Sequence, residues 1–233
     1  MTTVLALLQD AIPAVTAPPA QQALNLMQAF ILLFVVMGPP LKTPLVYHLR
    51  MMPFDHATRR SMAIKTAILA AVAVLIGGFL GQLLQKNWQI SPAAMLFAGG
   101  LIFLIVSLRT VLEQYSAPAH PQPVAPGSVP PKPEVPSAFE LAVPMIVTPY
   151  GLAGLITLLS YSHSTERTIA IVLLVLLVIF LHLLAMLFAG PIVRTVGPMP
   201  FRLFGVVIGS LTVGLSVQML ILAYHTLAAA PPS

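Results

Sequence analysis

Long apolar runs follow one another along the chain, and short segments rich in charge or proline separate them. About 20 consecutive apolar residues cross the hydrocarbon core of a bilayer as a helix. Counted by that rule, the pattern predicts an all-α membrane protein with six transmembrane helices. The six runs cover residues 24–52, 62–84, 92–112, 139–160, 168–190 and 203–227.

The six runs form two groups of three, so that the chain has five parts: two repeats, the linker between them and two terminal segments. The N-terminal segment has no basic residue before its hydrophobic stretch, so it lacks the positive start of a signal peptide. Eight prolines between the third and fourth runs favour an extended polyproline II linker, with a proline-motif docking site as the alternative. The parts are residues 1–22 (tail or surface helix), 23–115 (first three-span repeat), 116–137 (proline-rich cytoplasmic linker), 138–227 (second three-span repeat) and 228–233 (C-terminal tail).

The first run is interrupted near its middle by three prolines and a lysine, within the segment Gly38-Pro39-Pro40-Leu41-Lys42-Thr43-Pro44. A proline removes the hydrogen bond to the carbonyl four residues earlier, which here frees the carbonyls of Val35, Val36 and Pro40. Broken backbone at membrane depth persists only where protein buries it or where it lines a wet cavity. A lysine there needs a cavity, an anion or free carbonyls. The break therefore predicts a functional site.

The fourth run is interrupted in the corresponding place, at Pro149 and Gly151. A second correspondence joins the third and sixth runs, where Met95-Leu-Phe-Ala-Gly is similar to Arg202-Leu-Phe-Gly-Val. Because a three-span unit is odd, its second copy crosses the membrane in the opposite sense. The sequence thus predicts two inverted three-helix repeats with interrupted first and fourth helices, an arrangement typical of secondary transporters. The alternative is that proline and glycine are simply common in membrane helices.

Composition and charge agree with a membrane protein. Charged residues make up 7% of the chain and hydrophobic residues 58%, whereas soluble domains are roughly 25% charged. The chain has no cysteine, which excludes disulfides, thiolate nucleophiles and cysteine metal ligands. The net charge of +5 does not indicate nucleic-acid binding, because the basic residues lie in short loops, where they set orientation.

The distribution of basic residues predicts that both termini are periplasmic and that the linker is cytoplasmic. Eight lysines and arginines lie in or beside the loops after spans one, three and five, and two lie in the other loops. The eight are Arg50, Arg59, Arg60, Lys65, Arg109, Lys132, Arg194 and Arg202.

Enzymatic motifs are not found. The chain contains no His-Glu-x-x-His, no Gly-x-Ser-x-Gly and no intramembrane aspartate pair, so we expect neither an enzyme nor a cofactor or metal site. The acidic residues lie in tails, loops or span ends, which weakens a carboxylate-based proton or sodium site and leaves coupling through backbone carbonyls open. They are Asp10, Asp55, Glu113, Glu134, Glu140 and Glu166.

At its breaks the chain resembles the MarC-like membrane proteins, also grouped as six-span neutral amino acid transporters. The 38–44 segment is similar to the family's Asn-Pro-x-Gly-x-x-Pro motif, with Gly38 and Leu41 in place of its Asn and Gly. Residues 90–101 are similar to its third-span signature. In the fourth span, Gly151-Leu152-Ala153-Gly154 stands where the family has Ala-Gly-Pro-Gly.

The resemblance covers about residues 30–227. It implies a divergent member of the family in the bacterial inner membrane, acting as a secondary transporter or exporter of a small solute such as a neutral amino acid. A non-transporting membrane scaffold or sensor is the alternative function. The expected partners are the lipid bilayer and a small solute, with a coupling cation or proton left open and no nucleic acid.

The two breaks together predict a site for a zwitterion. A half-helix N-terminus carries partial positive charge, and the C-terminus of the opposite half offers carbonyls. We expect Lys42 and the amides near Thr43 to bind a carboxylate, and the carbonyls near Val35 and Met145 to receive an ammonium or a coupling cation. The candidate substrate-binding residues are Gly38, Pro39, Lys42, Thr43, Thr148, Pro149, Gly151 and Gly154.

Two of the candidate side chains have a plainer alternative. Lys42 could extend its ammonium to an interface rather than bind a ligand. His182 lies inside the uncharged fifth run and is a candidate proton relay. A histidine hydrogen-bonded between helices is the alternative for that position.

Overall fold

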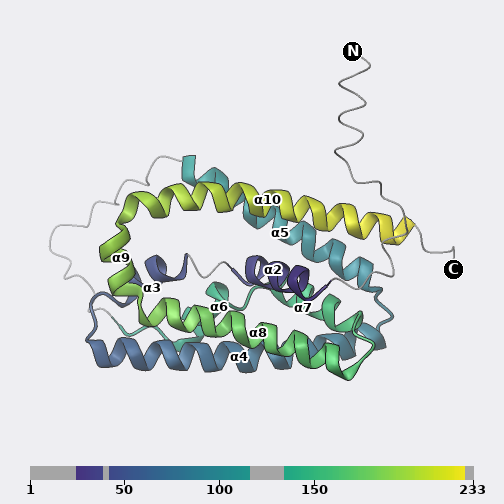
Figure 1. Ribbon diagram of the computed structural model, residues 1–233, viewed down its shortest axis with the longest axis horizontal. Coiled ribbons are helices and arrows are strands. Elements are labelled where there is room, and N and C mark those ends of the chain that lie inside the picture. The colour runs from purple at the N-terminus through teal and green to yellow at the C-terminus, as the bar shows by residue number, and fades with distance from the viewer. Residues whose placement is uncertain (1–24, 39–41, 116–133, 229–233) are drawn as a thin grey trace, which may run out of the picture.

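The chain folds into helices joined by short connections (Figure 1). The computed structural model describes residues 25–38, 42–115 and 134–228, and within these ranges it contains no strand. The helices are α2 (Leu26–Val36), α3 (Thr43–Met51), α4 (His56–Asn87), α5 (Pro92–Tyr115), α6 (Ala138–Met145), α7 (Pro149–Ser160), α8 (Thr165–Leu187), α9 (Ala189–Val196) and α10 (Pro198–Ala228). The predicted N-terminal tail, the C-terminal tail and most of the proline-rich linker lie outside the described residues.

Within the described ranges, four helices are long and apolar enough to cross a membrane: α4, α5, α8 and the 203–228 part of α10. Their large apolar side chains face outward, as on Ile105 and Leu211, which are 61% and 66% exposed. In a soluble protein such surfaces are rare, and lipid is the environment that suits them. The predicted second, third, fifth and sixth spans are therefore confirmed as long apolar helices, although α4 extends beyond both predicted ends.

The other two predicted spans are each divided into two helices, as their prolines indicated. The first consists of α2 and α3, and the fourth of α6 and α7. In the fourth span, the break lies at Ile146–Thr148 rather than at Pro149, because Pro149 begins α7. Proline is favoured at the first helical position, where an amide hydrogen has no partner.

The divided helices lie between two layers of long helices. In Figure 1, α5 and α10 run side by side on one edge, α4 and α8 on the opposite edge, and α2, α3, α6 and α7 lie between them. The packing agrees: α5 packs on α10, α4 on α8, α6 and α7 on α4, and α2 and α3 on α8. The breaks are thus enclosed by the bundle.

Close approach to α7 depends on glycines in the neighbouring helices. A Cβ on Gly78 of α4 would lie 2.7 Å from Leu155 Cδ2, and one on Gly99 of α5 would lie 2.8 Å from Ala153 Cβ. Gly77 and Gly81, which lie four residues apart on α4, meet α7 in the same way. Residues around the whole circumference of α7 are buried, so this helix is surrounded by protein rather than by lipid.

The sequence did not predict α9. The predicted fifth span continued to residue 190, but α8 ends at Leu187 and α9 starts at Ala189, after a turn at Phe188. This short helix packs against α3 and ends at Gly197, whose φ is +72°. The sixth helix consequently starts at residue 198, five residues before the predicted position.

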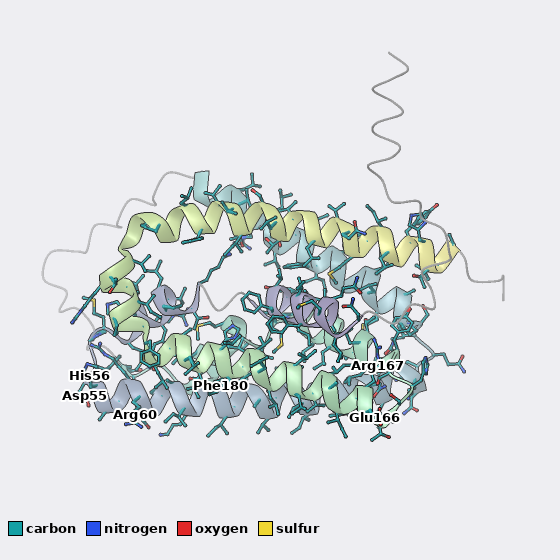
Figure 2. The ribbon with its side chains drawn as sticks, in the orientation of Figure 1. Asp55, His56, Arg60, Glu166, Arg167 and Phe180 are labelled. Atoms are coloured by element: carbon teal, nitrogen blue, oxygen red, sulfur yellow. The ribbon has the colours of Figure 1, made fainter. Side chains whose placement is uncertain are left out.

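Charged side chains mark the two ends of the bundle. Figure 2 shows Asp55, His56 and Arg60 at one end and Glu166 with Arg167 at the opposite end. Phe180, which is 52% exposed on α8, lies between these groups. An apolar middle with charged ends is the pattern expected of helices that cross a bilayer.

Candidate functional site

The first break begins where two consecutive prolines deprive α2 of its next amides. Residues 39 and 40 are both proline, so the carbonyls of Val35 and Val36 lack their helical partners. The Gly38 amide donates to the Val35 carbonyl at 3.3 Å, and the Thr148 hydroxyl donates to the Val36 carbonyl at 2.9 Å. Both carbonyls are therefore engaged within the protein. Gly38 turns the chain with φ of +88°, a conformation that glycine adopts without a steric penalty.

The second break also follows from prolines. Pro144 deprives the Glu140 carbonyl of its helical amide, and Pro149 does the same to the Met145 carbonyl. Arg50, at the end of α3, donates from Nη1 to the Glu140 carbonyl at 3.1 Å. Among the described residues, no donor reaches the Met145 carbonyl.

Thr148 joins the two breaks. Its hydroxyl oxygen accepts the Gly151 amide at 3.0 Å, which caps α7, while its proton goes to the Val36 carbonyl on α2. A Cβ on Gly151 would lie 2.5 Å from that hydroxyl oxygen and 3.3 Å from the Val36 carbonyl. The hydroxyl is buried, and it both donates to Val36 and accepts from Gly151.

Gly38 faces the second break directly. A Cβ on Gly38 would lie 3.0 Å from the Met145 carbonyl oxygen. The two interrupted helices are therefore in contact at their breaks, through Gly38 with Met145 and through Thr148 with Val36. Gly154 lies one turn further along α7 and faces the Val36 side chain.

Lys42 and Thr43 begin α3. Lys42 is the N-cap residue but makes no side-chain capping bond, and no described residue forms an ion pair or hydrogen bond with its half-buried ammonium. Thr43 is buried, at 2% exposure. Pro149 is exposed at the start of α7, and Pro39 lies outside the described residues. The roles expected of these residues toward a substrate stay predictions.

His182 lies beside the first break. Its ring is fully buried on α8, and Nδ1 lies 2.9 Å from the Val178 carbonyl of the same helix. The ring also lies against the backbone of Gly38. Among the described residues, Nε2 has no partner within hydrogen-bonding geometry. The proton relay and the hydrogen bond between helices both stay predictions for His182.

Two residues beside the breaks, Arg50 and Tyr150, were not predicted from the sequence to take part in the site. The sequence assigns Arg50 only to the orientation of the protein. Pro144 nevertheless indicates that the Glu140 carbonyl, four residues earlier, needs a donor from elsewhere. Tyr150, beside the second break, stacks on Phe103 of α5 with ring centroids 4.7 Å apart. Within the described ranges, no three His, Cys, Asp or Glu side chains are grouped so as to hold a metal ion.

Interrupted helices that meet inside a bundle of long apolar helices define the chain as a multi-pass α-helical membrane protein. Residues 24–227 match the family of MarC integral membrane proteins, and the chain belongs to that family. It is similar to the UPF0056 membrane protein MJ1677 of Methanocaldococcus jannaschii, with 23% identity over 171 residues that cover 70% of this chain and 78% of the relative. No solved structure matches it. The family membership predicted from the two breaks is confirmed.

Proposed function

We propose that this MarC-family protein is a secondary transporter or exporter that binds a small solute, such as a neutral amino acid, between its two interrupted helices. The observation that carries the proposal is the direct contact of the two breaks inside the bundle, through Gly38 with Met145 and Thr148 with Val36. Transporters place their substrate where interrupted helices meet near the middle of the membrane.

The reciprocal packing supports an inverted repeat. The divided helix of the first half, α2 and α3, packs on α8 of the second half, and the divided helix of the second half, α6 and α7, packs on α4 of the first. The remaining equivalents pair with each other, α4 with α8 and α5 with α10. We propose on this basis that each divided helix completes one crossing, which gives six spans in two inverted units of three.

The groups left without a partner near the breaks suit a zwitterion. The Lys42 ammonium can receive a carboxylate, since no described residue engages it. The Met145 carbonyl and His182 Nε2 are acceptors without donors in the described chain. Thr148 is a structural residue in this scheme rather than a ligand contact, because its hydroxyl already makes two hydrogen bonds within the protein.

Orientation and location follow the same proposal. We propose that the protein lies in a bacterial inner membrane with both termini periplasmic and the basic end of the bundle cytoplasmic. Since the natural chain has no cysteine, single cysteines at His56 and His163, at opposite ends, test this directly. A membrane-impermeant thiol reagent should label H163C but not H56C in intact cells, and the reverse pattern would invert the topology.

Transport is tested in proteoliposomes with a panel of small amino acids and related zwitterions. We expect uptake or efflux of at least one member, and loss of that flux in Lys42→Ala but not in Lys86→Ala, whose lysine is exposed at the end of α4. Unchanged flux in Lys42→Ala would remove Lys42 from the mechanism. No flux and no solute-dependent rise in Tm across the panel, with reconstitution verified, would overturn the transporter proposal in favour of a scaffold or sensor.

A further inference from the structure

The hydrogen bonding of His182 fixes which ring nitrogen carries the proton. Nδ1 lies 2.9 Å from the Val178 carbonyl, and a carbonyl only accepts, so Nδ1 must donate. In the neutral ring Nε2 is then an acceptor with a bare lone pair. This acceptor is fully buried, and no residue that the structure describes donates to it.

Two further acceptors without donors adjoin Gly38. The Gly38 amide already donates to Val35 at 3.3 Å, so the group that Gly38 presents to the His182 ring is its carbonyl. Within the described chain, no amide or side chain donates to the Gly38 carbonyl or to the Met145 carbonyl, whose oxygen lies 3.0 Å from the position of a Gly38 Cβ. Gly38 therefore adjoins three acceptors: His182 Nε2, its own carbonyl and the Met145 carbonyl.

The neighbouring described groups do not supply these donors. The next two residues are prolines without amide hydrogens, and the Thr148 hydroxyl proton is engaged by Val36. Buried acceptors without partners are rare, because each one loses its bonds to water without replacement. In a membrane interior, no bulk water is at hand to supply them.

We propose that His182 Nε2, together with the Gly38 and Met145 carbonyls, binds the primary ammonium group of the transported solute, an inference that rests on the proposed function for the identity of that solute. A primary ammonium carries three N–H donors and a positive charge, and it matches three acceptors in number and in charge. Hydrogen bonds to a charged donor are also the stronger kind. Because the ring is fully buried, the ammonium enters when α8 and α2 separate, as the movement of one repeat against the other would allow.

The assignment gives Lys42 and His182 different roles. Lys42 is left for the carboxylate end of a zwitterion, whereas His182 acts as a neutral acceptor for the opposite end. A protonated imidazole would itself donate to the Gly38 carbonyl and would exclude the ammonium. The neutral ring is therefore part of the proposal.

The test uses the purified full-length protein with two small cations as probes, methylammonium and tetramethylammonium. Both carry one positive charge, but only methylammonium has N–H donors. With ¹⁵N-labelled histidine, above the ordinary histidine pKa, we expect His182 to give a bare Nε2 resonance that methylammonium shifts and tetramethylammonium does not. The resonance is assigned by its loss in His182→Gln, since the chain has six histidines.

Variants supply an independent measurement. His182→Phe should weaken methylammonium binding, measured by calorimetry, by about tenfold or more, as expected for a lost hydrogen bond to a charged group. His182→Gln, which can keep a carbonyl acceptor near the Nε2 position, should retain part of the affinity. His163→Phe, at an exposed position outside the site, should bind as the natural protein does.

Several outcomes would overturn the inference. A protonated Nε2 in the ligand-free protein would make a proton the occupant, and equal responses to the two cations would indicate charge alone. If Nε2 is unprotonated but its resonance does not shift with methylammonium, the position binds only solvent and the inference is wrong. These results are distinct from a failure of transport: methylammonium binding without flux leaves the inference standing and removes the transporter, whereas flux without methylammonium binding removes the inference alone.

Discussion

The two breaks begin their second helices with the same dipeptide and are completed in different ways. Thr148-Pro149 opens α7 with a full side-chain cap, whereas Thr43-Pro44 opens α3 with Lys42 as an uncapped N-cap residue. The second break is closed by Thr148 and Gly151, and α7 beyond it is buried on all sides. The first break contains Gly38 and Lys42, beside which polar atoms have no partner in the part of the chain that the structure describes. The start of α7 is thus a structural joint, whereas the groups without described partners lie at the start of α3 and where Gly38 meets Met145.

The largest loss of stability is expected from Gly151→Ala. The added methyl would occupy space 2.5 Å from the Thr148 hydroxyl oxygen and 3.3 Å from the Val36 carbonyl, so the cap and the joint would both be displaced. Overpacking of this kind destabilises a protein by about 1–3 kcal/mol. Reversible denaturant unfolding in detergent measures the change. Gly214→Ala in α10, where a Cβ meets nothing within 4 Å, is the matched control, and equal losses in the two variants would contradict the joint.

Thr148→Val is expected to follow closely. It keeps the shape of the side chain but leaves the Val36 carbonyl and the Gly151 amide without partners, at about 1–3 kcal/mol for a buried unsatisfied group. Thr148→Ser should restore most of the stability.

The sharpest form of this test sets Thr148→Val beside Thr43→Val. Thr43 is equally buried, but its hydroxyl makes no hydrogen bond to any described residue. The Thr43 variant should therefore lose less stability than the Thr148 variant, because it breaks no hydrogen bond between described residues. If the two valine variants lose the same free energy of unfolding, the proposed difference between the two breaks is wrong.

A smaller effect is expected from Arg50→Met, which removes the donor to the Glu140 carbonyl. The contact is exposed, so water can replace the guanidinium and the loss should be about 1 kcal/mol. Arg50→Lys should recover part of it, since an ammonium donates without the planar fork. Thermal unfolding of the three proteins in detergent measures the order, and a loss as large as that of Thr148→Val would show that this carbonyl is shielded from water.

The smallest effect lies outside both breaks, at the start of α4. Hydrogen bonds from the Thr58 side chain and from backbone amides lower the pKa of Asp55 from its usual 3.8. A carboxyl with a lowered folded-state pKa stabilises the protein above its unfolded pKa and loses that contribution as pH falls through the folded pKa. The Tm of Asp55→Asn should therefore fall less than that of the natural protein on acidification below about pH 4, and parallel Tm curves would contradict this.

Helix existence and the interruptions were predictable because each depends on the local sequence. Apolar length predicted the four long helices, and the prolines predicted that the α2–α3 run and the α6–α7 run are each divided, although the second break precedes Pro149. The short helix α9 was not predicted, since Gly190 and Pro191 look like the end of a span, and only contact with α3 explains why the helix resumes.

The partners at the site were not predictable, because they join residues far apart in the chain. Thr148 and Val36 are 112 positions apart, and Arg50 and Glu140 are 90 apart. The sequence indicated that proline frees particular carbonyls, but it did not indicate which side chain donates a hydrogen bond to each of them. It likewise placed His182 inside a span without indicating that its ring meets Gly38.

The enclosure of α7 has a consequence for how the protein is made. A helix of 12 residues rises about 18 Å, well short of the roughly 30 Å of a hydrocarbon core. Alone in lipid it would leave the backbone of its break without partners. The glycines of α4 and α5 that receive it, Gly78 and Gly99, are translated before it. These glycines therefore exist before α7 is synthesised, so α7 can pack on them as it enters the membrane.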